Sequence, residues 1–180
     1  MTPLTLLDAL VVEIKKVAAG IKLPTTLEAL QPLSVFAQRL PDRGRDRRNI
    51  DNTPYPYCIV RMLTCTDAAP NKAATYTGVL TFGTYDDGSD DGWRDVFNLI
   101  EHVRQHLESI RFLGDCFILS DEAPLRMEIP YEQGVNHMEG YLFFSYDVSH
   151  RYPEVDFDGR EFYEEQEYRE GGTKVDGGFR

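Results

Sequence analysis

The sequence predicts an α+β domain in which an N-terminal helix and a long central helix pack on a mostly antiparallel sheet. Two segments, Leu4–Ala19 and Gly92–Ile110, carry apolar residues at helical spacing. Three others, Tyr57–Thr66, Thr75–Tyr85 and Met138–Ser149, are rich in the β-branched and aromatic residues typical of strands. With three shorter strands added, the order is one helix, three strands, a second helix and three strands. That order favours helices packed against an antiparallel sheet.

The N-terminal part is predicted to form a helix, a short strand and an exposed loop. The helix Leu4–Ala19 has one apolar stripe and is expected to end at Gly20; the stripe consists of Leu7, Leu10, Val11, Ile14, Val17 and Ala18. Ser34–Pro41 is a short candidate for the first strand. The arginine-rich segment, Arg39–Pro54, follows with five arginines, three aspartates and no apolar period, which indicates an exposed loop.

The next two strands lead into the long helix. Tyr57–Thr66 is apolar on both faces except at Arg61, which predicts a central strand covered on both sides. Thr75–Tyr85 is the following strand. The helix Gly92–Ile110 has one apolar stripe, formed by Trp93, Val96, Phe97, Ile100, Val103, Leu107 and Ile110.

The C-terminal part is predicted to hold two short strands, the last long strand and an extension. The short strands lie in Cys116–Ser120 and Leu125–Tyr131, with a turn between them, and Met138–Ser149 closes the domain. From Pro153 onward the chain is acidic, carries scattered aromatic residues and ends rich in glycine. We expect one domain over residues 1–152 and an extension over 153–180, mobile alone and ordered by a partner.

Composition restricts the classes of function. The chain has 180 residues and a formal net charge of −11, which argues against a protein that grips duplex DNA through a basic face. An acidic surface along which nucleic acid slides without sticking stays compatible with that charge. No apolar run approaches the ~20 residues of a membrane span, so we expect no membrane segment. Cys58, Cys65 and Cys116 are odd in number and lie in apolar runs, which predicts reduced core thiols in a protein made in a cytosol.

An aspartate cluster between the second long strand and the long helix resembles a calcium loop. Asp87, Ser89 and Asp91 match the first ligand positions of an EF-hand, Gly92 the glycine and Asp95 the ninth position, but the twelfth is Asn98 instead of glutamate. A strand also precedes the cluster where an EF-hand has a helix. We interpret it as a strand-to-helix turn in which Asp90 or Asp91 caps the helix.

Two histidines offer a weaker metal pattern. His102 and His106 share a face of the long helix with Asp95, and such a set can hold zinc. No third ligand is evident and no HExxH motif is present, so we interpret the pair as boundary residues of an amphipathic helix. No nucleophile, phosphate-loop or dinucleotide motif is found. The expectation is a protein without catalytic residues, metal or cofactor.

Charged segments are the candidate contact residues. The arginine-rich segment is able to grip phosphates or to dock on an acidic protein surface, and the net charge of the chain favours the second. A natural counterpart is the acidic stretch Glu154–Glu170 of a neighbouring subunit. The candidate interface residues are Arg43, Arg45, Arg47, Arg48, Asp86, Asp87, Glu164 and Glu165.

In the order of these segments and in their residue patterns, the chain resembles the tail terminator, or tail completion, proteins of long-tailed bacteriophages. The likeness spans about Leu4–Val148 and lies in the N-terminal helix, the entry "TPYPYCIVRM", the strand and acidic turn "GVLTFGTYDD", the helix "GWRDVFNLIEHVRQHLES" and the strand "EGYLFFSYDV". The arginine-rich segment and the acidic C-terminus exceed the minimal pattern of the family.

The resemblance implies a structural virion protein without catalytic residues. It implies a homohexameric ring at the head-proximal end of the tail, assembled in the host cytoplasm, that caps the tube and joins tail to head. Its partners would be the tail tube protein and the head–tail connector proteins, with viral DNA passing through the lumen without specific binding. The alternatives are another connector or tube component and, from a different class, a metal-dependent enzyme. A small acidic adaptor that binds a basic partner through its C-terminus is compatible with the composition.

Overall fold

The computed structural model describes residues 2–25, 30–41, 54–66, 74–86, 92–114, 116–133 and 136–148. All of them belong to one compact unit, Met1–Ser149. The core of the arginine-rich segment, the cluster residues Asp87, Asp90 and Asp91, and the whole C-terminal extension therefore lie outside the described residues.

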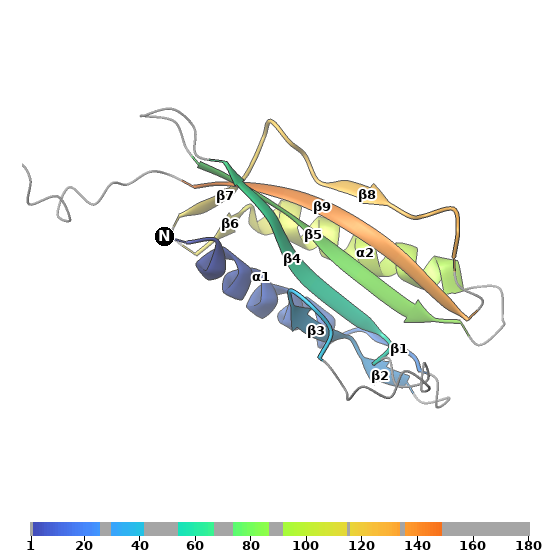
Figure 1. Ribbon diagram of the computed structural model, residues 1–180. Helices are drawn as coiled ribbons and strands as arrows, with labels where there is room; N and C mark the ends of the chain where they lie inside the picture. The colour runs from blue at the N-terminus through green and yellow to red at the C-terminus, as the bar shows by residue number, and fades with distance from the viewer. Residues whose placement is uncertain are drawn as a thin grey trace, which may run out of the picture. The chain divides into compact units, whose positions relative to one another are not determined.

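The described chain forms two long helices and nine strands (Figure 1). The helices are α1 (Pro3–Ala18) and α2 (Gly92–Ile110). The strands are β1 (Lys22–Pro24), β2 (Leu30–Pro32), β3 (Ser34–Ala37), β4 (Tyr57–Thr66), β5 (Ala74–Tyr85), β6 (Phe112–Leu113), β7 (Phe117–Leu119), β8 (Arg126–Glu128) and β9 (His137–Val148). This architecture confirms the predicted α+β fold with a mostly antiparallel sheet.

The main sheet is built on three long antiparallel strands. Its order is β3-β4-β5-β9-β7-β6, and β8 pairs with β9 beside β7. β5 pairs with β9 along its whole length, from Ala74 opposite Val148 to Tyr85 opposite His137. β3 is parallel to β4, whereas the other pairs are antiparallel. β1 and β2 form a separate two-stranded ribbon.

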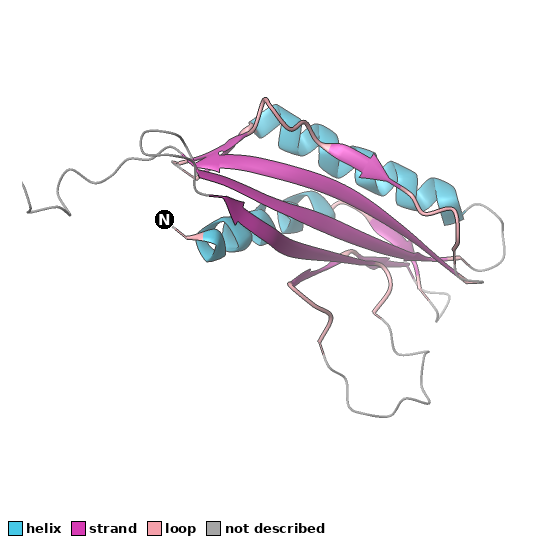
Figure 2. Ribbon diagram, turned by 45° about the horizontal axis from the view of Figure 1, so that its top comes forward, coloured by secondary structure: helices cyan, strands magenta, loops and turns pink. Residues whose placement is uncertain are grey.

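Both helices cover the same face of this sheet, as the views of Figures 1 and 2 show. Even-numbered residues of β5 and β9, such as Leu80, Phe82, Leu142 and Phe144, point to the helices and are buried, because side chains alternate along a strand. They form one core with apolar residues of both helices, including Leu10 of α1. The odd-numbered residues point to the other side, which neither helix covers.

Local sequence explains where α1 begins. The side chain of Thr2 accepts a hydrogen bond from the backbone N–H of Thr5, and Pro3 occupies the first turn, where its missing N–H costs nothing. Leu6, Leu10 and Ile14 then follow one another at helical spacing and are buried. The buried stripe, more than intrinsic propensity, holds the helix on the sheet.

The stripe predicted for α2 is partly wrong. Trp93 and Phe97 are 48% and 43% exposed, and Leu99, which the prediction left out, is buried together with Val96 and Ile100. The buried arc is therefore rotated toward Leu99. Spacing identifies an apolar face, but the packing partner decides which part of a broad face is buried.

The second half of β4 also differs from its prediction. Tyr57–Val60 is buried, as expected for a covered central strand, but Arg61 and the residues from Leu63 to Thr66 are exposed. β3 pairs only with the first four residues of β4, and the register with β5 shifts between Met62 and Thr64. Cys65 is therefore exposed. Cys116, just before β7, is partly exposed as well, so only Cys58 is the core thiol that was predicted.

Within the described part of the chain, neither helix is long and apolar enough to cross a membrane.

Candidate interaction surface

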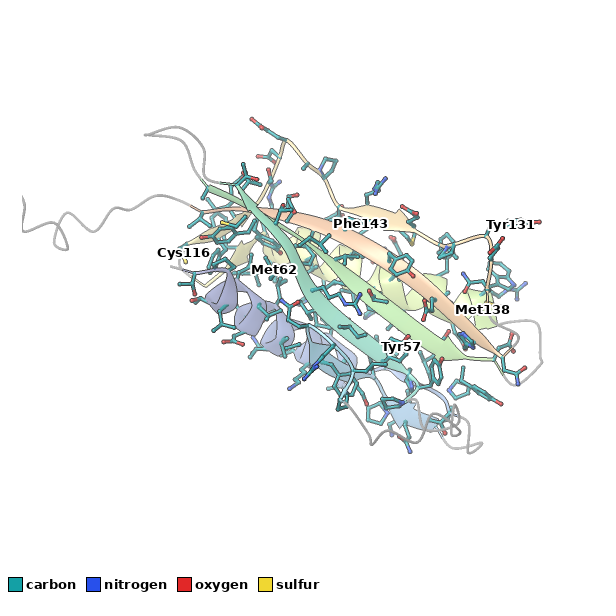
Figure 3. The ribbon with its side chains drawn as sticks, in the orientation of Figure 1. Tyr57, Met62, Cys116, Tyr131, Met138 and Phe143 are labelled. Atoms are coloured by element: carbon teal, nitrogen blue, oxygen red, sulfur yellow. The ribbon has the colours of Figure 1, made fainter. Side chains whose placement is uncertain are left out.

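The face of the main sheet opposite the helices gathers aromatic and hydrogen-bonding side chains. We call it the open face and define it by Tyr57, Ile59 and Arg61 of β4, Val79, Thr81 and Gly83 of β5, Arg126 and Glu128 of β8, and Glu139, Tyr141 and Phe143 of β9. Figure 3 shows two of them, Tyr57 and Phe143, standing on the side of the sheet away from α2. The surface is therefore assembled from two pairs of consecutive strands, β4–β5 and β8–β9, that are about 40 residues apart in the sequence.

A glutamate bridges two tyrosines at the centre of this surface. The hydroxyl of Tyr57 donates to Glu139 Oε1 at 2.9 Å, and that of Tyr141 donates to Glu139 Oε2 at 3.2 Å. The backbone of Glu139 is held in turn by Gln133, which accepts from its N–H at 2.7 Å and donates to its carbonyl at 3.0 Å. Both carboxylate oxygens thus have a phenol donor, and the backbone that carries them is fixed.

Gly83 makes room for this arrangement. It lies directly opposite Tyr57 in the β4–β5 register, and a Cβ added there would lie 2.3 Å from the Tyr57 ring. The ring therefore lies flat over the glycine and reaches across β5 to Glu139 on the next strand. A larger residue at position 83 would displace the tyrosine.

The electrostatics of the cluster keep its tyrosines protonated. Burial, followed by the nearby charge of Glu139, raises the pKa of Tyr57 far above its usual value, and the same causes raise the pKa of Tyr141. Both phenols therefore stay neutral hydrogen-bond donors throughout the physiological pH range. The arrangement is a charge-assisted network in which Tyr57 is buried and Tyr141 is partly exposed.

Tyr55 extends the aromatic surface toward the edge of the sheet. Its ring centroid lies 5.4 Å from that of Tyr57, 6.3 Å from that of Tyr85 and 6.0 Å from that of His137. These are ordinary distances for interacting aromatic rings. The residue that follows the arginine-rich segment is thereby anchored at the end of the sheet where β5 stops.

Other contacts fix the rest of the open face. The guanidinium of Arg126 lies 4.5 Å from the ring centre of Phe143. Arg61 Nε donates to the carbonyl of Gln38 at 3.0 Å, and Thr75 donates to Asp147 Oδ1 at 2.7 Å. Aromatic rings, arginines and hydroxyls in such a mixture are the residues that protein interfaces favour.

A single hydroxyl tests the central network. We expect Tyr57→Phe to lower the free energy of unfolding by about 1–2 kcal/mol, because a buried hydrogen bond to a carboxylate is lost. Tyr141→Phe is the matched control: its hydrogen bond is longer and more exposed, so its loss should stay below about 1 kcal/mol. Urea unfolding at pH 7 measures both. Equal losses for the two variants would contradict the arrangement described here.

Of the predicted interface residues, Asp86 alone lies in the described part of the chain. It is 7% exposed, and its backbone N–H donates to the carbonyl of Asn136 at 3.0 Å. Its carboxylate lies against Gly92, the first residue of α2, where a Cβ would come within 2.9 Å of Oδ2. The residues outside the described ranges are Arg43, Arg45, Arg47, Arg48, Asp87, Glu164 and Glu165.

The two histidines of α2 lie in different environments. His106 Nε2 lies 3.0 Å from Glu13 Oε1 of α1, and Glu13 also accepts from Lys16 Nζ at 2.6 Å. These partners lower the pKa of Glu13, with the Lys16 hydrogen bond as the largest cause. His102 is exposed. In the described ranges, no three His, Cys, Asp or Glu side chains come together in a way that would hold a metal ion.

The sequence did not reveal the Tyr57–Glu139–Tyr141 network. Tyr57 and Glu139 are 82 residues apart, and they meet because both lie opposite Gly83, one on each side of β5. The available signal was the glycine, since a glycine inside an aromatic-rich strand often marks the close approach of a neighbouring group.

Comparisons with known proteins show no family for this chain. No protein-family model matches the sequence, and no curated protein matches it. Of the solved structures that match, one is similar over 83% of this chain and 96% of its own length, with a TM-score of 0.45 and 16% sequence identity. Its name describes no function.

Proposed function

We propose that this chain is a structural subunit of a bacteriophage tail that forms a ring on the finished tail tube and provides the docking surface for the head. The resemblance to tail terminator proteins supplies the family. Closing the ring satisfies the contacts between neighbouring subunits, so further copies of the chain do not add to it indefinitely. The protein would work in the virion, at the head-proximal end of the tail.

The open face is the observation that carries the proposal. Helices cover one side of the sheet. On the other side Arg61 and Arg126 are exposed and Tyr141 and Phe143 partly exposed, and they surround a buried centre formed by Tyr57, Ile59, Val79 and Thr81. A broad, pre-organised surface of this composition is suited to contact with another protein. Such a surface is what a subunit needs when it must bind both its own copies and two different neighbours.

The charge of the chain supports a passage for DNA. A net charge of −11 gives a ring of several copies a strongly negative character, and like charges repel the phosphate backbone. A lumen with that character lets the genome move through without being held. The proposal therefore includes passage of viral DNA and excludes sequence-specific recognition of it.

Particle size tests the ring. We expect purified protein to form closed particles of about six subunits, at about six times the 20.6 kDa of one chain, by mass photometry and negative-stain microscopy. Purified tail tubes incubated with the protein should stop growing and carry it at one end. Filaments would indicate a tube subunit instead. Strictly monomeric protein at high concentration would overturn the proposal.

A further inference from the structure

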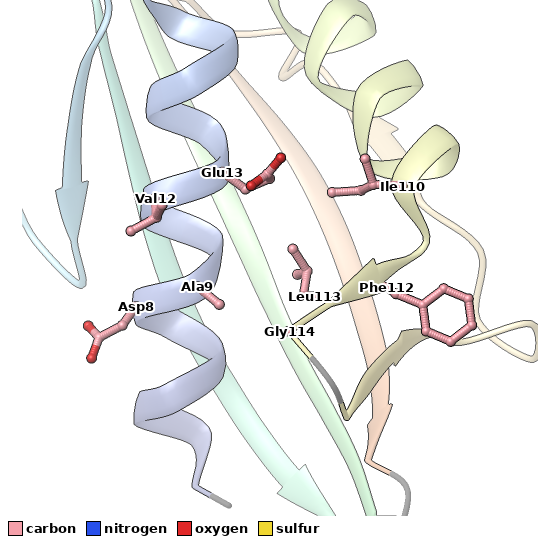
Figure 4. Close-up of a pocket in the computed structure, with 8 residues that line it drawn as sticks. All are labelled: Asp8, Ala9, Val12, Glu13, Ile110, Phe112, Leu113 and Gly114. Carbon is pink, nitrogen blue, oxygen red and sulfur yellow. The ribbon is translucent and has the colours of Figure 1, made fainter.

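A groove opens on the helical side of the molecule between α1 and the end of α2. Its volume is about 440 Å³, and it is lined by Asp8, Ala9, Val12, Glu13, Ile110, Phe112, Leu113 and Gly114. Figure 4 shows Ala9 and Glu13 pointing from α1 toward Ile110 and Leu113 across the gap. Val12 and Phe112 are 54% and 61% exposed, so the apolar lining is accessible to another molecule.

The two carboxylates of this groove differ in their partners. Glu13 is held by Lys16 and His106. Asp8 is exposed at the outer side of α1 and has no hydrogen bond or ion pair within the described residues. An apolar lining with an accessible carboxylate at its rim fits a side chain that has an aliphatic stem and a cationic head.

The chain itself contains a segment of that chemistry. Between Arg43 and Arg48 stand four arginines and one aspartate in six residues, in a protein whose net charge is −11. This is the most basic stretch of the sequence. Arginine also combines an apolar stem with a fork that binds carboxylates through two hydrogen bonds.

The length of chain between the arginines and Tyr55 bears on whether the groove that they occupy belongs to their own subunit or to a neighbour. Tyr55 is anchored on Tyr85 and His137, at one end of the sheet. The groove lies at the other end of the sheet. Its residue Leu113 pairs with Phe117 of β7, Phe117 pairs with Val148 of β9, and Val148 lies opposite Ala74 of β5. The eleven steps from Ala74 to Tyr85 span about 36 Å at about 3.3 Å per residue.

Six residues lie between Arg48 and Tyr55, and the seven Cα–Cα steps span at most about 25 Å when fully extended. The distance between the two ends of the sheet exceeds this backbone reach, which favours a neighbouring subunit as the source of the arginine. A second copy of the chain has no such restriction. The acceptor groove and the donor segment are then two different surfaces, which is the arrangement that generates rings.

We propose that Arg47 and Arg48 of one subunit dock in the groove between α1 and β6 of the next, with an arginine head group on Asp8. This contact rests on the ring proposed above and names the residues that hold neighbouring subunits together. One groove and one arginine pair per subunit give as many contacts as there are subunits in the closed ring.

A charge reversal with rescue tests the contact. Asp8→Lys alone and the double change Arg47→Glu/Arg48→Glu should each lower the fraction of protein in rings at least tenfold at a fixed concentration. The triple variant that combines them should recover most of that fraction. Glu122→Lys is the matched control, since Glu122 is exposed, lies outside the groove and undergoes the same change of charge. Circular dichroism should show every variant folded.

Crosslinking identifies the occupant directly. A photoreactive phenylalanine analogue at Val12, in a mixture of ¹⁵N-labelled and unlabelled subunits, should crosslink to residues 42–50 of a different subunit. Crosslinks within one subunit, or to residues 153–180, would overturn the contact. If Asp8→Lys protein forms rings to the same extent as wild type, the proposed contact is wrong but the proposed ring is not affected. Wild-type protein that never forms rings would overturn both proposals together.

Discussion

Gly78→Ala should lower the free energy of unfolding by about 3 kcal/mol, the upper part of the usual range for overpacking a core. A Cβ at this position would lie 2.4 Å from the backbone carbonyl oxygen of Arg61 and 2.3 Å from Cζ of Phe144. Phe144 lies directly opposite Gly78 in the β5–β9 register and is only 2% exposed. The ring is able to move only at the expense of the core, and the β4 backbone only at the expense of the sheet.

Gly20→Ala is the matched control for this change. Gly20 follows α1, and the nearest atom to an added Cβ is the carbonyl oxygen of Val17 at 3.9 Å, an ordinary contact. That variant should keep or slightly raise the free energy of unfolding, because alanine restricts the unfolded chain. Urea unfolding measures both variants. Equal stability of Gly78→Ala and wild type would show that β4 and β9 are spaced more widely than described.

The long elements were predictable because their patterns are local. α2 begins and ends where its apolar period does, and β9 differs from its prediction by one residue at each end. The short strands β1, β2 and β6 were missed, since two or three residues carry no readable period. The exposure of Cys65 was missed for another reason. It depends on where β3 stops pairing with β4, and that is set by tertiary structure and not by the local sequence pattern.

The candidate surface was not predictable from the residues that form it. Tyr57, Glu139 and Tyr141 meet through the register of β4, β5 and β9, and a shift by one residue would turn each of them to the other face. The sequence indicated charged segments as contact residues, and most of those lie outside the described ranges. Asp86, the described one, is buried against the start of α2, because the strand-to-helix turn brings it there.

We expect the protein to lose stability steeply above about pH 9. Burial raises the pKa of Cys58 and of Tyr146, and burial with the charge of Glu139 raises that of Tyr57. In the unfolded chain these groups ionise near their ordinary values, about 8.5 for a thiol and about 10 for a phenol. The unfolded state then releases protons that the folded state retains, so each group lowers the free energy of unfolding by about 1.4 kcal/mol per pH unit.

The loss of unfolding free energy should begin near pH 9, where Cys58 of the unfolded chain ionises, and should steepen above pH 10, where the tyrosines do. Urea titrations between pH 8 and 11 measure it. Tyr146→Phe should reduce the slope above pH 10 by about 1.4 kcal/mol per pH unit, since one such group is removed. It should cost little at pH 7, because the buried Tyr146 hydroxyl has no hydrogen-bond partner among the described residues. Tyr131→Phe is the matched control: Tyr131 is fully exposed, so its removal should leave the slope unchanged. The same slope in Tyr146→Phe and Tyr131→Phe would mean that the phenol of Tyr146 ionises in the folded protein, and that solvent reaches the core between the two helices.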